Sequence, residues 1–296
     1  MIVADKEQVE STEQVQRQPY EQSLEFAVKA TIGNLLIFII LSSVNFRFID
    51  IQFQDTNSIH PWIVDGIQRG FLAILAMRSL GKIIASSGFK FSFATKGFKK
   101  GMIAHIPMLI CIFSVPFILF SVPEARLDVS NALPSLIPRA IFDVGNAVWE
   151  EVLWRGVLMT GLLIKWESSW NESATVKKRV AFMLICSFAF GLIHFGGDLG
   201  WVHVIFAGVW GTLFSAAYIY SRNLLACSVA HFAVNYILSF VQRMFYYDIE
   251  PAMLFTQRFM TVNTILGVLI VIPVAIYLTI KAEPFRLEDI EENPST

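Results

Sequence analysis

Residues 148–156 read Val-Trp-Glu-Glu-Val-Leu-Trp-Arg-Gly, so Glu150 and Glu151 stand side by side within an apolar stretch. A charged side chain at the centre of a membrane helix costs roughly 2.5–3.5 kcal/mol on insertion scales. Two adjacent carboxylates in such a stretch therefore need partners or a chemical function. Arg155, one helical turn beyond Glu151, is a candidate partner.

The composition of the chain is that of a polytopic membrane protein. Of its 296 residues, 55% are hydrophobic and 16% are charged, whereas soluble domains average about 25% charged residues. The net charge of −1 offers no basic surface to a nucleic acid partner. The three cysteines lie in apolar runs, which indicates buried core positions and no disulfide framework.

A membrane-spanning helix needs about 20 mostly apolar residues, and about eight segments fit this pattern. They are residues 31–46, 64–86, 101–121, 139–164, 179–195, 201–220, 224–244 and 262–280. The sequence therefore predicts an all-α, polytopic transmembrane helical bundle. Asp65 and Arg69 interrupt the second segment, which predicts a partly interfacial position. The fourth segment carries several charges, so it must face other helices or a wet cavity.

These segments define one membrane-embedded domain over residues 28–282, with its polar motif-bearing part at 139–237 and with polar tails at 1–27 and 283–296. Short cytoplasmic loops of membrane proteins are enriched in lysine and arginine. Such residues cluster on one side of the predicted topology: Lys90, Lys96, Lys99, Lys100, Lys165, Lys177, Lys178, Arg179, Arg222 and Lys281. We therefore expect an integral, multi-pass protein of a bacterial-type cytoplasmic membrane, with both termini cytoplasmic.

Helical spacing assigns different tasks to the two glutamates. Asp143, Asn146 and Glu150 are three, four and seven residues apart, so they form one polar stripe. Glu151 points about 100° away from Glu150, and Arg155 lies only about 40° from Glu151. Glu151 is therefore the expected ion-pair partner of Arg155. Glu150 is left facing the polar interior, where a carboxylate without a close counter-charge holds a proton more readily and suits a general base.

Two later segments add imidazole and amide groups. His194 ends Phe-Gly-Leu-Ile-His, and His231 and Asn235 share one helical face in His-Phe-Ala-Val-Asn. Taken singly, such residues are more often packing residues or hydrogen-bonding links between helices. Together with the glutamates they can bind a water molecule or stabilise an oxyanion. His203 is expected near the cavity mouth and His105 in the packing.

The three segments together resemble the signature of the CAAX protease and bacteriocin-processing family, also called the Abi family, and its type II CAAX prenyl proteases. The family pattern is Glu-Glu-x-x-x-Arg, then Phe-x-x-x-His, then His-x-x-x-Asn. The matching segments occur in this order: Glu150-Glu151-x-x-x-Arg155, Phe190-x-x-x-His194 and His231-x-x-x-Asn235. No His-Glu-x-x-His zinc helix and no Gly-x-Ser-Gly loop is present in the sequence.

The resemblance implies an intramembrane endopeptidase, a hydrolase that cleaves a peptide bond. Glu150 resembles the acid that activates the attacking water, and His194 resembles the histidine that assists this water. His231 and Asn235 resemble the pair that stabilises the oxyanion. On the charge-based topology His194 lies near the outer end of its span, whereas relatives that trim prenylated proteins imply a cavity open to the cytosol.

The requirement for a metal stays open at this point. Glu151 and Arg155 resemble a structural pair, and the family has been treated both as a zinc metalloprotease and as a metal-free glutamate protease. Two acids and two histidines are able to ligate zinc. The candidate ligands are Glu150, Glu151, His194 and His231.

Two other functions also stay open. Acids and histidines at the midplane form relays in membrane transporters, although no inverted repeat is visible here. A non-hydrolytic immunity or scaffold protein would keep the same fold without cleavage. The expected partners are membrane lipids and a peptide or a prenylated or leader-bearing protein substrate, with no nucleic acid.

Overall fold

The computed structural model describes residues 25–41, 60–84, 96–122, 129–167, 172–195, 199–244 and 249–283. Nearly all of these residues are helical, and no strand occurs among them. The predicted all-α class is therefore confirmed. Most of the two predicted polar tails, and Lys90, lie outside the described residues.

The helices follow one another along the chain with short connections. The first covers residues 25–41. The others are α2 (His60–Ile84), α3 (Lys96–Ala104), η1 (Ile106–Met108), α4 (Leu109–Ser121), α5 (Val129–Ala132), η2 (Leu133–Ser135), α6 (Leu136–Glu151), η3 (Val152–Met159), α7 (Thr160–Glu167), α8 (Glu172–Leu192), α9 (Trp201–Ser221), α10 (Leu224–Met244), α11 (Ile249–Leu266), η4 (Gly267–Val271) and α12 (Ile272–Lys281). Of these, η1 and η2 are 3-10 helices, and η3 and η4 are π-helices.

Helices occur at all eight predicted spans, but they differ in their apolar character. Four are long and apolar enough to cross a membrane: Lys96–Ser121, Trp201–Ser221, Leu224–Met244 and Pro251–Lys281. The helices at the other predicted spans are shorter or carry more charge within the described residues. Helix α6 is the clearest case, because it buries Asp143, Glu150 and Glu151 inside the bundle.

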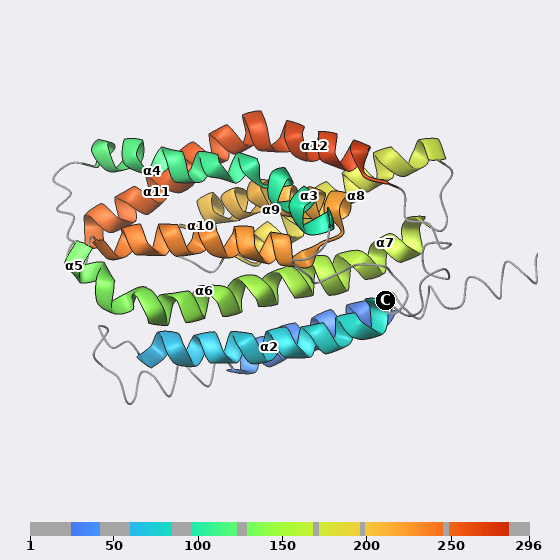
Figure 1. The fold of residues 1–296 in the computed structure, drawn as a ribbon, viewed down its shortest axis with the longest axis horizontal. Helices are drawn as coiled ribbons and strands as arrows, with labels where there is room; N and C mark the ends of the chain where they lie inside the picture. Colours follow the sequence, from blue (N-terminus) through green and yellow to red (C-terminus); the bar gives the residue numbers. More distant parts are fainter. Residues whose placement is uncertain are drawn as a thin grey trace, which may run out of the picture.

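Helix α9 lies in the middle of the bundle (Figure 1). All its residues from Val209 to Ile219 are buried. It packs against α3, α8, α11 and α12, while α6 lies between α2 and α10. Helices α6, α8, α9 and α10 carry the predicted site residues, so the fold brings the three sequence motifs towards one region.

The contact between α2 and α6 depends on two glycines. A methyl group on Gly66 would lie 2.9 Å from the Cα atom of Phe142, and one on Gly145 would lie 2.6 Å from the Gly66 carbonyl oxygen. Small residues allow membrane helices to approach each other this closely. The close contact brings Arg69 of α2 to Asn146 of α6, and the guanidinium donates a hydrogen bond to the amide oxygen.

Replacing Gly66 with alanine is expected to lower the free energy of unfolding by about 1–3 kcal/mol, because the added methyl group overpacks the α2–α6 contact. Gly81→Ala is the matched control in the same helix, since a methyl group there meets nothing within 4 Å. Alanine also favours helix more than glycine does, so this control should unfold no earlier than the wild type. Thermal unfolding in detergent compares the wild type with the two variants. Equal unfolding temperatures for Gly66→Ala and Gly81→Ala would show that the α2–α6 contact does not depend on Gly66.

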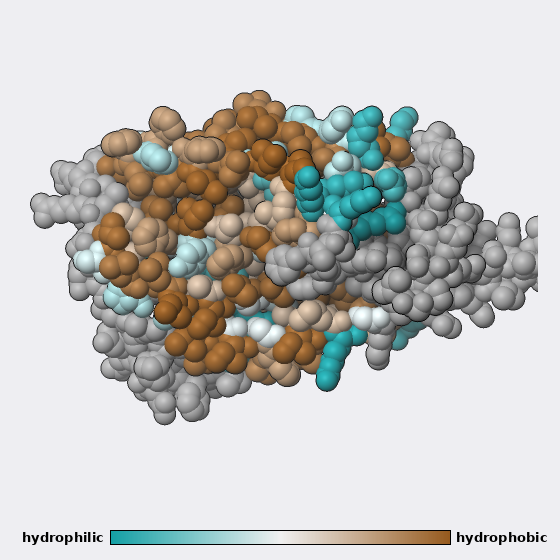
Figure 2. All heavy atoms as spheres, in the orientation of Figure 1, coloured by the Kyte–Doolittle hydropathy of each residue, from teal (hydrophilic) through white to brown (hydrophobic). Residues whose placement is uncertain are grey.

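Exposed lysines gather at one end of the bundle, where Figure 2 shows hydrophilic side chains beside a broad apolar surface. They belong to the starts of α3 and α8 and to the end of α12: Lys96, Lys99, Lys100, Lys177, Lys178 and Lys281. Contacts link these helix ends, because Arg179 and Arg222 donate to the carbonyl oxygens of Ala282 and Glu283 at 3.0 and 3.3 Å. Among the described residues, these cations of the predicted cytoplasmic side thus share one end of the molecule.

Candidate active site

A cavity of about 310 Å³ lies among α6, α8, α9 and α10. Its lining includes the four residues that the sequence singles out for the chemistry: Glu150, His194, His231 and Asn235. These residues come from three distant parts of the chain. The helical packing therefore provides one cavity that all four residues border.

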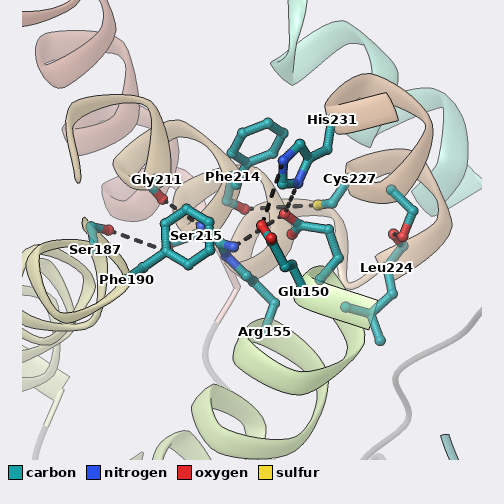
Figure 3. A network of polar contacts seen from close by, with 12 residues as sticks. Glu150, Arg155, Ser187, Phe190, Gly211, Phe214, Ser215, Leu224, Cys227 and His231 are labelled. Atoms are coloured by element: carbon teal, nitrogen blue, oxygen red, sulfur yellow. Dashed lines mark hydrogen bonds and ion pairs between the residues drawn. The ribbon is translucent and has the colours of Figure 1, made fainter. Parts of the chain in front are cut away.

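The polar stripe of α6 forms one wall of this cavity. Asp143, Asn146 and Glu150 all border it. Glu150 is only 6% exposed, and its Oε2 atom has no hydrogen-bond partner among the described residues. This oxygen lies 3.7 Å from Nε2 of His231, across the gap between α6 and α10 (Figure 3). Glu150 is thus a buried carboxylate at the border of the cavity.

Glu151 points away from the cavity and into a hydrogen-bonded core. It is fully buried, and its Oε1 atom accepts from Arg155 Nη1 at 3.1 Å and from His231 Nδ1 at 2.8 Å. Neither Glu151 nor Arg155 is among the described residues that line the cavity. The pairing agrees with the spacing argument, which assigned Glu151 to Arg155 and left Glu150 facing the interior.

Arg155 connects this core to helix α9. Its Nη2 atom donates to the carbonyl oxygen of Gly211 at 3.3 Å. The guanidinium also lies over two aromatic rings, 4.3 Å from the centre of Phe190 and 5.4 Å from that of Phe214 (Figure 3). Aromatic faces attract such a cation, and the attraction is greater where water is excluded. Arg155 is therefore held from two helices besides its own.

The orientation of His231 follows from its bond to Glu151. A carboxylate only accepts hydrogen bonds, so Nδ1 of His231 carries the proton that it donates to Glu151. Nε2 is then the nitrogen that faces Glu150. Asn235 lies one turn further along α10, is half-buried and borders the same cavity.

His194 follows the last turn of α8, and its main-chain amide still bonds to the helix. Its Nδ1 atom bonds to the carbonyl oxygen of Phe190 at 2.9 Å, and its ring packs against the rings of Phe190 and His203. His203 of α9 borders the cavity as well. His105, in contrast, is a buried packing residue bonded to the carbonyl oxygen of Gly101 and set against Phe214.

Comparison with protein families gives a match that covers this region. The family model "Type II CAAX prenyl endopeptidase Rce1-like" matches residues 131–237, a range that contains all three motifs. The match confirms the resemblance to the CAAX protease family. Comparisons with curated proteins and with solved structures gave no match. The matched segment is thus similar to that of type II CAAX prenyl endopeptidases.

The sequence offers four candidate metal ligands, Glu150, Glu151, His194 and His231. Among the described residues, no group of three histidine, cysteine, aspartate or glutamate side chains is placed to hold a metal ion. One oxygen of Glu151 is already occupied by Arg155 and His231. Nδ1 of His194 is likewise occupied by a main-chain oxygen.

Sequence reasoning missed the contribution of Arg69. This residue was expected to make its segment partly interfacial, but it borders the cavity and donates to Asn146. Its guanidinium lies between 4.8 and 5.6 Å from the ring centres of Phe142, Phe38 and Trp149. In the sequence, Arg69 is visible only as a cation within an apolar segment. Its hydrogen-bond partner lies on α6, which is distant in sequence.

Proposed function

We propose that this protein is an intramembrane endopeptidase in which Glu150 activates a water molecule. The family match supports a CAAX-type membrane protease. The observation that carries the proposal is the position of Glu150, a buried carboxylate that borders the same cavity as His194, His231 and Asn235. A cavity of about 310 Å³ also has room for water beside a bound peptide group, because one water takes about 30 Å³ of liquid volume.

In the proposed reaction, Glu150 removes a proton from water while the water oxygen attacks the carbonyl carbon of the peptide bond. His194 borders the same cavity and assists this water through the ring nitrogen that is not bonded to Phe190. The attack produces a tetrahedral oxyanion. When the C–N bond breaks, the proton on Glu150 passes to the leaving amine, and the carboxylate returns to its starting state.

His231 and Asn235 are proposed to stabilise the oxyanion, because preorganised donors act strongly where water is excluded. His231 already donates from Nδ1, so a bond from Nε2 to an oxyanion requires the doubly protonated ring. Glu151 supports that state, since its carboxylate lies 2.8 Å from Nδ1. Glu151 is thus proposed to act through His231, without contacting substrate.

The substrate is proposed to be a peptide segment that reaches the cavity from the membrane, carried by a prenylated or leader-bearing protein. Both termini are proposed to face the cytoplasm, with the lysine-bearing end of the bundle at the cytoplasmic interface. This orientation is supported by the shared position of the exposed lysines of α3, α8 and α12.

The direct test is cleavage of candidate peptides by the purified full chain in lipid nanodiscs, with and without a chelator. Cleavage that a chelator leaves unchanged supports the glutamate mechanism. Loss of cleavage with the chelator, restored by zinc, would overturn the metal-free form of the proposal. Substrate-dependent ion flux in liposomes without any peptide cleavage would instead identify a transporter.

Replacing His231 with glutamine is expected to lower kcat by about 10²- to 10³-fold, the usual effect of removing one oxyanion donor. KM should change little, because the donor acts on the transition state. His105→Gln is the control, since His105 is also buried but is not among the described residues that line the cavity. Steady-state kinetics per folded molecule measure both variants, and equal kcat values for the two would exclude the oxyanion role.

A further inference from the structure

We propose that Thr160 and Tyr218 are positioning residues that set the geometry of the site through the π-helix η3. The proposal rests on the proposed function, because it concerns how the glutamate pair is held. Neither side chain is among the described residues that line the cavity. Both are fully buried, and they lie on different segments, Thr160 at the start of α7 and Tyr218 in α9.

The π-helix begins immediately after the glutamate pair and ends just before Thr160. A π-helix closes its turns with bonds between residues five apart, is rare, and is often found at functional sites. In an α-helix, Arg155 would lie about 40° past Glu151 around the axis. The wider turn of η3 reduces this offset. Nη1 of Arg155 donates to the carboxylate of Glu151 at 3.1 Å.

Thr160 closes the wide turn with its side chain as well as its main chain. Its amide nitrogen and its Oγ1 atom both donate to the carbonyl oxygen of Arg155, the latter at 3.0 Å. Oγ1 lies 2.6 Å from the hydroxyl oxygen of Tyr218. Because the single hydroxyl proton of Thr160 is directed to Arg155, Tyr218 is the donor in this second bond. The two hydroxyls thus form a directed chain that ends on the Arg155 main chain.

A series of side-chain contacts connects Arg155 to the cavity. Arg155 bonds to Glu151, Glu151 bonds to Nδ1 of His231, and Nε2 of His231 faces Glu150 at 3.7 Å. Every member of this series is buried. A shift of the Arg155 main chain would therefore move the His231 ring relative to Glu150, while no contact with substrate is removed.

Helix α9 holds the π-helix at two points. Gly211 accepts from the Arg155 side chain at 3.3 Å, and Tyr218, two turns further along α9, donates to Thr160. Since α9 lies in the middle of the bundle, it provides a fixed reference for both contacts (Figure 1). The structure thus assigns to α9 the task of holding the wide turn that positions the glutamate pair.

The test compares four variants of the full chain: Thr160→Val, Thr160→Ser, Tyr218→Phe and the double variant Thr160→Val/Tyr218→Phe. Thr160→Val keeps the shape but removes the hydroxyl, and we expect kcat to fall by about 10- to 100-fold with little change in KM. Thr160→Ser keeps the hydroxyl and should retain most of the activity. The control is Thr212→Val, since the buried hydroxyl of Thr212 bonds to Val209 of its own helix, outside this chain of contacts.

The double variant separates positioning from stability. Removing one partner of a buried hydrogen bond costs more stability than replacing both partners with apolar groups. The double variant should therefore unfold at a higher temperature than Thr160→Val and still have a low kcat. The positioning role is wrong if the double variant recovers kcat together with its unfolding temperature. It is also wrong if Thr160→Val has the same kcat as Thr212→Val. Wild-type protein that cleaves no peptide, or a Glu150→Gln variant that cleaves normally, would instead overturn the proposed function itself.

Discussion

Replacing Glu150 with glutamine is expected to abolish peptide cleavage. Glutamine keeps the size of the side chain but cannot accept a proton from water, so the general base is lost. Removing a positioned general base typically lowers a rate by about 10²- to 10⁴-fold. The measurement is kcat for a fluorogenic peptide with purified protein in nanodiscs. Oε2 of Glu150 has no hydrogen-bond partner among the described residues, so the contact that the substitution weakens is the 3.7 Å approach to Nε2 of His231.

The control for this variant is its stability. Glu150→Gln should unfold at the wild-type temperature or above it, since a buried acid is replaced by a neutral group. Glu150→Ala should be equally inactive, which shows that the loss follows from the carboxylate and not from the new amide. Wild-type activity in either variant would rule out Glu150 as the base.

Replacing Arg155 with methionine is expected to lower the free energy of unfolding by about 3–5 kcal/mol, because the buried carboxylate of Glu151 loses the permanent cation among its two partners. The Arg155 and Glu151 side chains are 2% and 0% exposed, so water cannot replace the lost ion pair. Methionine fills most of the same volume, which limits the contribution of a new cavity. Unfolding in detergent, followed by circular dichroism, measures the loss.

Two further variants make this prediction specific. Lys29→Met breaks an ion pair whose side chains are 73% and 65% exposed, and it should leave unfolding unchanged. The double variant Arg155→Met/Glu151→Gln removes the buried charge together with its partner, so it should regain part of the lost stability. If Arg155→Met unfolds like Lys29→Met, Arg155 does not stabilise the buried acid.

The sequence alone was sufficient to predict the fold class and to distinguish the two glutamates. Both inferences depend on local periodicity: apolar segments of about 20 residues predict membrane helices, and a repeat of 3.6 residues separates the faces of Glu150 and Glu151. The structure has helices at all eight predicted segments, and it pairs Glu151 with Arg155. Local spacing carries this information because α6 is regular up to Glu151.

What the sequence could not predict depends on partners distant in the chain. The π-helix is held by Tyr218, which lies 58 residues after Thr160, and periodicity arguments assume an α-helix throughout. Arg69 finds Asn146 at a separation of 77 residues, so its role in the cavity is not visible in its own segment. Spacing also does not show that His203 would pack against His194.

The lysines at the start of α8 limit how a substrate can reach the site. Lys177 and His194 are the ends of a helical stretch that spans about 25 Å, at 1.5 Å per residue. A peptide threaded from the lysine-bearing end would need about seven extended residues to cover that depth. A substrate with only three or four residues beyond the scissile bond would have to arrive from within the bilayer or from the opposite leaflet. Cleavage of a peptide series that differs in the number of these residues should therefore report the route of entry.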